Sequence, residues 1–188
     1  MATLTDSEKE ILLNLARLTV ERVVAGQSKP HIELVMYSPR LQQDGASFVT
    51  LTRHGMLRGC IGALEAYQPL VQDVSEHAEA AALDDYRFPP VQSDEVEHLE
   101  IEISVLTPSM PFHYETAEEL LKNLRPGIDG VVLHDGSRRA TFLPQVWEQV
   151  PEPVEFLSHL CKKMGSPGDL WRKKKLQVET YQVEEFHE

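Results

Sequence analysis

The sequence predicts an α+β fold in which mainly antiparallel or mixed sheets pack against helices. Strand patterns occur as local hairpins, and helical patterns lie between them without the regular strand–helix alternation of a doubly wound fold. The chain has 188 residues, of which 41% are hydrophobic and 26% charged, as in globular proteins that bury a core. We expect residues 1–188 to form a single domain, and two lobes within it are compatible with this pattern.

Residues 5–26 are predicted to form the first helix. Thr5 and Glu8 have the spacing of a capping box, and Gly26 is typical of a helix end. Small and apolar side chains recur at helical spacing, which predicts one buried face made of Ile11, Leu12, Leu15, Ala16, Thr19 and Val23. This helix is expected to be scaffold.

A hairpin is predicted after residues 27–45, whose composition is that of a loop. Residues 47–52 alternate between the two sides of a strand, His54-Gly55 is typical of a turn, and residues 56–62 return as a second strand. The hairpin places the sequence Leu-Arg-Gly-Cys-Ile-Gly, the second to seventh residues of that returning segment, on a strand.

An alanine-rich helix is predicted over residues 69–83, because a proline lies in its first turn and small residues share one side. Phe88-Pro89-Pro90 interrupts the chain. Residues 99–106 then give the clearest strand pattern, with one face formed by Ile101, Ile103 and Val105 and the other by Glu100, Glu102 and Ser104.

The remaining chain is expected to alternate short helices with a second hairpin. The predicted strands are residues 131–133, 140–143 and about 178–181, and the predicted helices are residues 116–124, 145–150 and 154–164.

The charge of the chain opposes direct binding to nucleic acid. Lysine and arginine number 18 and aspartate and glutamate 30, which gives a net charge of −12, whereas binding to phosphates needs a basic surface. The basic run Arg172-Lys173-Lys174-Lys175 precedes an acidic tail and is expected to be a solvated face. Without an apolar run of membrane length or a secretory leader, we expect a cytoplasmic protein.

No cofactor or metal site is predicted. Phosphate-loop, dinucleotide-binding and nucleophile-elbow patterns are all missing from the sequence. His159 and Cys161 offer two ligands where a structural zinc ion needs four. The two cysteines, Cys60 and Cys161, are expected to be free thiols in a reducing compartment. Cys161 lies on the apolar stripe of a predicted helix and is expected in the core.

The hexapeptide Leu57-Arg58-Gly59-Cys60-Ile61-Gly62 resembles the hallmark motif of the AMME syndrome candidate-region domain family, whose stand-alone bacterial and archaeal members are called AmmeMemoRadiSam system protein A. The resemblance continues through residues 80–88, 101–106, 127–131, 141–147 and 156–163 and covers roughly residues 7–187. One departure is Met164, where relatives commonly have alanine; this change affects packing more than chemistry.

The resemblance implies an α+β protein with a larger and a smaller lobe and with the hexapeptide near their junction. It also implies association with Memo-like proteins and radical S-adenosylmethionine enzymes. It supplies no reaction, since the family has no settled biochemical activity.

Cys60 is the central candidate of the predicted site. A thiolate is a strong nucleophile, and the guanidinium of Arg58, two residues away on the same strand face, could lower its pKa. The alternative is that Cys60 is a small core residue between Gly59 and Gly62, which let another backbone approach closely. If the strand face is inward, Arg58 needs a carboxylate partner, for which the candidates are Asp84, Asp85 and Glu102.

Other residues extend the candidate site. Glu102 could act as general acid or base and His54 could carry protons toward Cys60, although a strand face in solvent and a turn histidine in solvent fit the same patterns. Asp85 and Arg87 could continue a polar network or simply end a charged helix. Phe142 and Trp147 are expected to pack in the core rather than to form a ligand platform.

Three functions follow from these alternatives. In the first, the chain acts with Memo-like and radical S-adenosylmethionine proteins through a cleft at the hexapeptide, where Gly59, Gly62, Asp85 and Arg87 bind the ligand or partner. In the second, Cys60 is the nucleophile of an enzyme, Arg58 stabilises negative charge, and Glu102 or His54 moves protons. In the third, the chain is a regulatory interaction module. The oligomeric state does not follow from the sequence.

Overall fold

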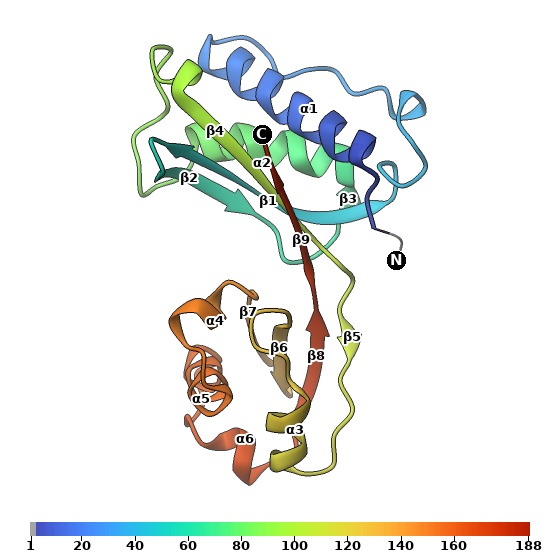
Figure 1. The fold of residues 1–188 in the computed structure, drawn as a ribbon, viewed down its shortest axis with the longest axis vertical. Coiled ribbons are helices and arrows are strands. Elements are labelled where there is room, and N and C mark those ends of the chain that lie inside the picture. Colours follow the sequence, from blue (N-terminus) through green and yellow to red (C-terminus); the bar gives the residue numbers. More distant parts are fainter. Residues whose placement is uncertain (1–2) are drawn as a thin grey trace. The chain divides into compact units, whose positions relative to one another are not determined.

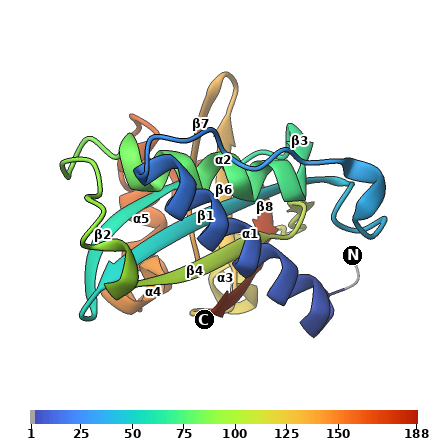
Figure 2. The same ribbon diagram turned by 90° about the horizontal axis from the view of Figure 1, so that it is seen from above.

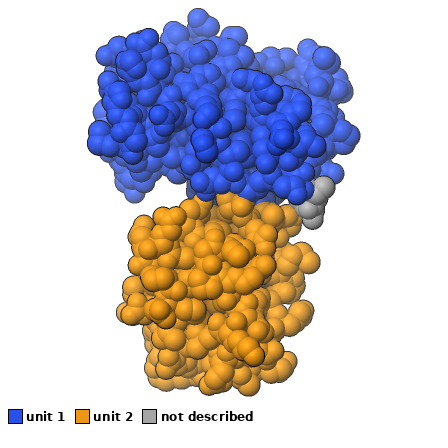
Figure 3. Space-filling view, in the orientation of Figure 1, with its two compact units in different colours: residues 1–106, 184–188 blue, residues 107–183 orange. Residues whose placement is uncertain are grey.

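The structure, a computed structural model, describes residues 3–188 and confirms the α+β class. Its contacts divide the chain into two compact units, residues 1–106 with 184–188 and residues 107–183 (Figure 3). Each unit contains its own antiparallel sheet. None of the helices among residues 3–188 is long and apolar enough to cross a membrane.

Unit 1 packs two long helices on one face of a sheet (Figures 1 and 2). The strand order is β2-β1-β4-β9, and β3 pairs with β1. The elements are α1 (Asp6–Val24), η1 (Leu34–Met36), β1 (Asp44–Arg53), β2 (Met56–Gly62), β3 (Gln68–Pro69), α2 (Leu70–Leu83), η2 (Val96–His98), β4 (Leu99–Leu106) and β9 (Val183–His187).

The first helix begins with the predicted capping box. The Thr5 side chain accepts a hydrogen bond from the Glu8 amide, and the Glu8 side chain accepts one from the Thr5 amide. Both acceptors satisfy amides that have no partner inside the helix. The buried face of α1 packs with α2 and with β1 and β4 into one apolar core, which includes Leu12, Val49 and Ile103.

A buried polar contact joins α2 to the sheet. The Asp73 carboxylate, fully buried on α2, accepts hydrogen bonds from the Ser47 amide at 2.8 Å and the Ser47 hydroxyl at 2.6 Å. Buried carboxylates are tolerated when such donors replace water. This contact fixes the position of α2 along β1.

Unit 2 has a four-stranded antiparallel sheet of order β5-β8-β6-β7. Trp147 stacks on Phe156 with ring centroids 3.6 Å apart, Phe142 meets the same ring edge to face, and Cys161 is buried in this core. The elements are β5 (Met110–Pro111), α3 (Ala117–Asn123), β6 (Gly130–Asp135), β7 (Arg138–Phe142), α4 (Val146–Gln149), α5 (Pro153–Lys163), α6 (Leu170–Lys173) and β8 (Gln177–Tyr181).

The last element of the chain differs from the sequence prediction, and the basic run agrees with it. Residues 183–187, expected as an acidic tail, form strand β9 because they pair with β4. The basic run at residues 172–175 is exposed, which confirms the expected solvated face, and its lysines form ion pairs with Asp169, Asp135 and Glu115.

Candidate functional site

The hexapeptide lies on β2, an edge strand of the unit 1 sheet, and contains a β-bulge. The register pairs Cys60 with Thr50 and Leu57 with Thr52, so Arg58 is an extra residue that has no partner on β1. A bulge re-aims the side chain of the inserted residue. The simple alternation that would place Arg58 and Cys60 on one strand face therefore does not hold.

Arg58 is bound to Glu95, and not to Asp84, Asp85 or Glu102 as the sequence suggested. Its Nε and Nη2 atoms donate to the two Glu95 carboxylate oxygens at 2.9 and 2.8 Å. Both side chains are nearly buried, with exposed fractions of 12% and 11%. The expected partners were wrong because the bulge turns the guanidinium toward the segment before η2.

The Glu95 carboxylate ties three parts of unit 1 together. Besides Arg58, it accepts hydrogen bonds from Arg53 Nη1 at 3.1 Å and from the Gln92 amide at 2.8 Å. The bond from Arg58 lowers the Glu95 pKa to about 2, with the Gln92 amide and the charges of both arginines adding to the effect. Arg58 Nη1 also donates to the Pro89 carbonyl at 2.9 Å.

Asp85 and Arg87 hold the main chain of Cys60. The Cys60 amide donates to Asp85 Oδ2 at 2.9 Å, and Arg87 Nη2 donates to the Cys60 carbonyl at 3.1 Å. Arg87 also binds Asp85 through Nε at 2.9 Å and Nη2 at 2.6 Å. These groups occupy the outer edge of β2 at Cys60, where an added strand would otherwise pair.

The Asp85 carboxylate is therefore part of a network, whereas Asp84 is exposed. The Asp85 side chain is only 2% exposed, and its hydrogen bond with Arg87 holds its pKa well below the usual range, with the Cys60 amide contributing. Of the two alternatives for Asp85, the structure supports the network.

Cys60, Thr50 and Glu102 lie side by side on three neighbouring strands, and we call them the Cys60 row. Thr50 is opposite Cys60 on β2 and opposite Glu102 on β4, and directly paired residues share a sheet face. Thr50 Oγ1 donates to Cys60 Sγ at 3.3 Å. With strands about 4.8 Å apart, the Cα atoms of Cys60 and Glu102 are about 10 Å apart.

Glu102 has a neighbouring carboxyl on β9. Burial raises the Glu102 pKa, and the charge of Glu185 and a hydrogen bond to it raise it further, while His187 acts in the opposite direction. An ionised carboxylate only accepts hydrogen bonds, so the bond between Glu102 and Glu185 requires a proton on one of them.

The two glycines of the motif have structural roles. A Cβ atom on Gly59 would lie 2.1 Å from the Ala81 carbonyl oxygen of α2, and one on Gly62 would lie 2.3 Å from the Phe48 ring. Gly59 thus allows α2 to approach the sheet closely, and Gly62 makes room for Phe48. Both contacts agree with the packing alternative for these residues.

The structure does not bring His54 to Cys60. His54 lies at the hairpin turn with a positive φ of 53°, and its ring is 5.7 Å from that of His98. It is four residues beyond Thr50, which corresponds to about 13 Å along a strand.

The second cysteine is separate from this site. Cys161 is fully buried, burial raises its pKa, and both cysteines are free thiols. Among residues 3–188, the structure shows no cluster of three or more histidine, cysteine or acidic side chains that could hold a metal ion.

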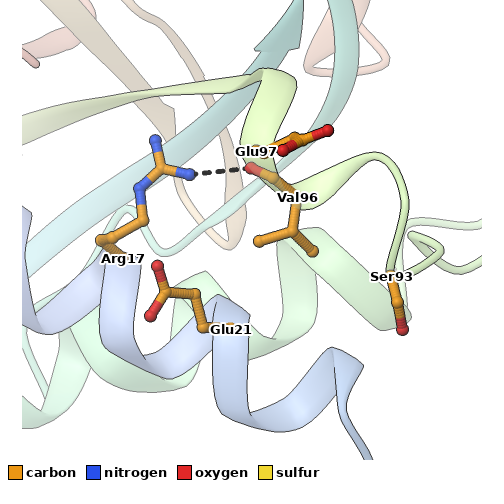
Figure 4. A pocket seen from close by; sticks show the side chains of 5 residues that line it. All are labelled: Arg17, Glu21, Ser93, Val96 and Glu97. Atoms are coloured by element: carbon orange, nitrogen blue, oxygen red, sulfur yellow. Dashed lines mark hydrogen bonds between the residues drawn. The ribbon is translucent and has the colours of Figure 1, made fainter.

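Two surface pockets occur in unit 1 away from the hexapeptide. One, of about 480 Å³, is lined by Arg17, Glu21, Ser93, Val96 and Glu97, and Figure 4 shows Arg17 donating to the Val96 carbonyl. The other, of about 530 Å³, lies between residues 28–32 and the start of α2. Neither is lined by a predicted site residue.

Sequence reasoning missed Glu95, Thr50 and Glu185. Nothing local marks Glu95 as the partner of Arg58, which lies 37 residues earlier. Thr50 follows from the hairpin register only if the bulge is known, and Glu185 follows only if residues 183–187 are recognised as a strand.

The fold and this motif define an AMMECR1-type domain, and the comparisons agree. The AMMECR1 family model matches residues 13–186, so the chain belongs to this family. A protein of Methanothermobacter thermautotrophicus is 36% identical over all of this chain and 97% of its own length. Protein MK0488 of Methanopyrus kandleri is 36% identical over 98% of this chain and 90% of its own.

A solved structure has the same fold. The crystal structure of the uncharacterised protein PH0010 from Pyrococcus horikoshii superposes with a TM-score of 0.83 at 33% identity, and the match covers 98% of this chain and 93% of that one.

Proposed function

We propose that this AMMECR1-family chain is a binding component that acts with Memo-like and radical S-adenosylmethionine proteins through the surface at residues 57–62. The observation that carries the proposal is the contrast between the buried contacts of the motif and the exposed apolar side chains beside it. Its arginine, its glycines and the main chain of Cys60 are all used in internal contacts, whereas apolar side chains beside them are exposed. The family resemblance supplies the partners.

The exposed side chains form what we call the β2-edge patch, made of Met56, Leu57 and Tyr86. Their exposed fractions are 69%, 43% and 93%. Met56 and Leu57 are consecutive on β2. Tyr86 lies between Asp85 and Arg87, which bind the main chain of Cys60. Exposed large apolar side chains are typical of protein interfaces, and tyrosine is among the residues that contribute most to binding.

Three hydrogen bonds hold the segment that carries Tyr86 against β2. Residues 85–90 run along the outer edge of β2, since Asp85 and Arg87 contact Cys60 and the Pro89 carbonyl contacts Arg58. A preorganised surface loses less conformational entropy when it binds. Because the edge is already occupied at Cys60, we expect the partner to bind the side chains rather than to add a strand.

The test is a binding titration with the purified Memo-like and radical S-adenosylmethionine proteins of the same organism, each alone and together. We expect Tyr86→Ala and Leu57→Glu to weaken binding at least about tenfold, the size expected for an interface anchor. Val35→Glu is the matched control, since Val35 is 83% exposed on η1. Absence of binding by the unmodified chain, or equal loss in the control, would overturn the proposal.

A second candidate is a cysteine-dependent enzyme, favoured by the Cys60 row. Cys60 is the nucleophile, the Thr50 hydroxyl donates to its sulfur, and Glu102, whose pKa is raised by burial, is the candidate general acid or base two strands away. Arg58 has no part in this version, because Glu95 neutralises it. Its substrate is a small molecule or protein of unknown class.

Thiol alkylation against pH tests the enzyme version. Peptide mass spectrometry separates Cys60 from the buried Cys161, which serves as an internal control. Fast labelling of Cys60 with an apparent pKa well below about 8.5 supports a reactive nucleophile. Labelling of both thiols only upon unfolding removes this candidate. A regulatory interaction module would use the same β2-edge patch and differ only in its partner.

A further inference from the structure

All of the net charge of the chain lies in unit 1. Unit 1 has 8 lysine and arginine residues against 20 aspartate and glutamate residues, a net charge of −12, whereas unit 2 has 10 of each. The acidity noted in the sequence is therefore a property of the unit that carries the hexapeptide.

The arginines nearest the β2-edge patch form ion pairs with carboxylates of the same unit. Arg53 and Arg58 both bind the Glu95 carboxylate, and Arg87 binds Asp85. These two carboxylates are almost buried, with side-chain exposures of 11% and 2%. They pair with the three arginines and leave one positive charge, against the exposed carboxylates of residues 84–100.

The segment that borders the patch exposes acidic side chains instead. Residues 84–100 contain four exposed carboxylates, on Asp84, Asp94, Glu97 and Glu100. They flank the stretch that Arg58 and Arg87 hold against β2. Asp84 directly precedes Asp85, which binds the Cys60 amide, and Asp94 directly precedes Glu95, which binds Arg58. These two exposed carboxylates therefore lie beside the residues that contact β2.

We infer that the partner surface that binds the β2-edge patch carries lysine and arginine side chains around an apolar pocket that receives Tyr86. The inference rests on the proposed function and specifies the chemistry of its partner. Exposed carboxylates attract a basic protein surface and repel the phosphates of nucleic acid. Charges of this kind act mainly on the association rate and are screened by salt over about 10 Å at 0.1 M.

The experiment measures association and dissociation rates with the purified Memo-like and radical S-adenosylmethionine proteins at 50 and 500 mM NaCl. We expect the association rate to fall at least about tenfold at the higher salt, with a smaller change in dissociation. The double variant Asp84→Lys/Asp94→Lys should lower the association rate at 50 mM NaCl about tenfold.

The control is Glu10→Lys/Glu33→Lys, which makes the same change in net charge at exposed positions on α1 and before η1. It should change the association rate less than about threefold, because its charges lie outside the patch. Thermal unfolding checks that both double variants remain folded.

The outcomes separate the two proposals. If no partner binds the unmodified chain, the proposed function fails and this inference fails with it. If a partner binds through Tyr86 but its association rate is independent of salt, or falls equally in both double variants, the proposed function stands and the basic partner surface is ruled out.

Discussion

Thr50 donates a hydrogen bond to the sulfur of Cys60 at 3.3 Å, and the two residues face each other only because Arg58 is inserted as a bulge. From the hairpin turn, Arg53 pairs with Met56 and Thr52 with Leu57. Continued without the bulge, that register would place Cys60 opposite the buried Val49. The inserted arginine therefore moves the cysteine from the helix-covered face to the opposite face of the sheet.

Removing the Glu95 carboxylate should destabilise unit 1 markedly. Glu95→Ala leaves Arg58, only 12% exposed, without its partner, and we expect the free energy of unfolding to fall by about 2 kcal/mol. Urea denaturation measures the change. Glu97→Ala is the control, because the Glu97 side chain is 78% exposed; a loss as large as that of Glu95→Ala would contradict the assigned role.

The Glu95 carboxylate should also make the stability of the fold depend on pH in the acidic range. The folded-state pKa of Glu95 is about 2, below its ordinary value of 4.5. A group with a lowered pKa stabilises the fold above its unfolded pKa and loses this contribution as pH falls through the folded value. Between about pH 5 and pH 2, the unmodified chain should therefore lose about 2 kcal/mol more stability than Glu95→Gln. Parallel curves for both proteins would refute this.

The pH dependence that Glu102 contributes to stability has the opposite sign. Burial and Glu185 raise its pKa, so the fold favours the protonated form and loses stability as pH rises from the ordinary glutamate value through the raised one. Glu102→Gln, which stays neutral, should be more stable than the unmodified chain at pH 7. Chemical denaturation at several pH values tests this, with Glu100→Gln on the same strand as control. A destabilised Glu102→Gln would contradict the prediction.

Gly59 should tolerate no side chain. The Cβ atom of Gly59→Ala would lie 2.1 Å from the Ala81 carbonyl oxygen, so α2 must move and we expect a loss of at least about 2 kcal/mol. Gly168→Ala is the control, because its nearest neighbour is the flexible end of Lys162 at 3.0 Å. Thermal unfolding compares the two, and equal melting temperatures would show that the close approach is not required.

Much of the fold follows from local patterns in the sequence. The capping box at Thr5 and Glu8 and the alternation through residues 99–106 both appear in the structure, since each depends on residues near one another in the chain. Strand β9 was not predictable in this way, because its acidic residues become a strand only through pairing with β4.

The candidate site was less predictable for a related reason. Cys60, Asp85 and Glu102 were identified from the sequence, but the relation of Cys60 to Glu102 depends on the register of three strands. One inserted residue, Arg58, changes that register, and its partner Glu95 is distant in the chain. The periodicity of a sequence predicts that a segment is a strand, but it does not predict the position of a single bulge in that strand.

The most direct test of the account compares Cys60→Ala with Tyr86→Ala in binding the Memo-like and radical S-adenosylmethionine proteins. Binding is assigned to the β2-edge patch, and the Cys60 thiol takes no part in it. We therefore predict that Cys60→Ala binds within about twofold of the unmodified chain and that Tyr86→Ala loses at least about tenfold in affinity. Loss of binding in Cys60→Ala with full binding by Tyr86→Ala would contradict this assignment.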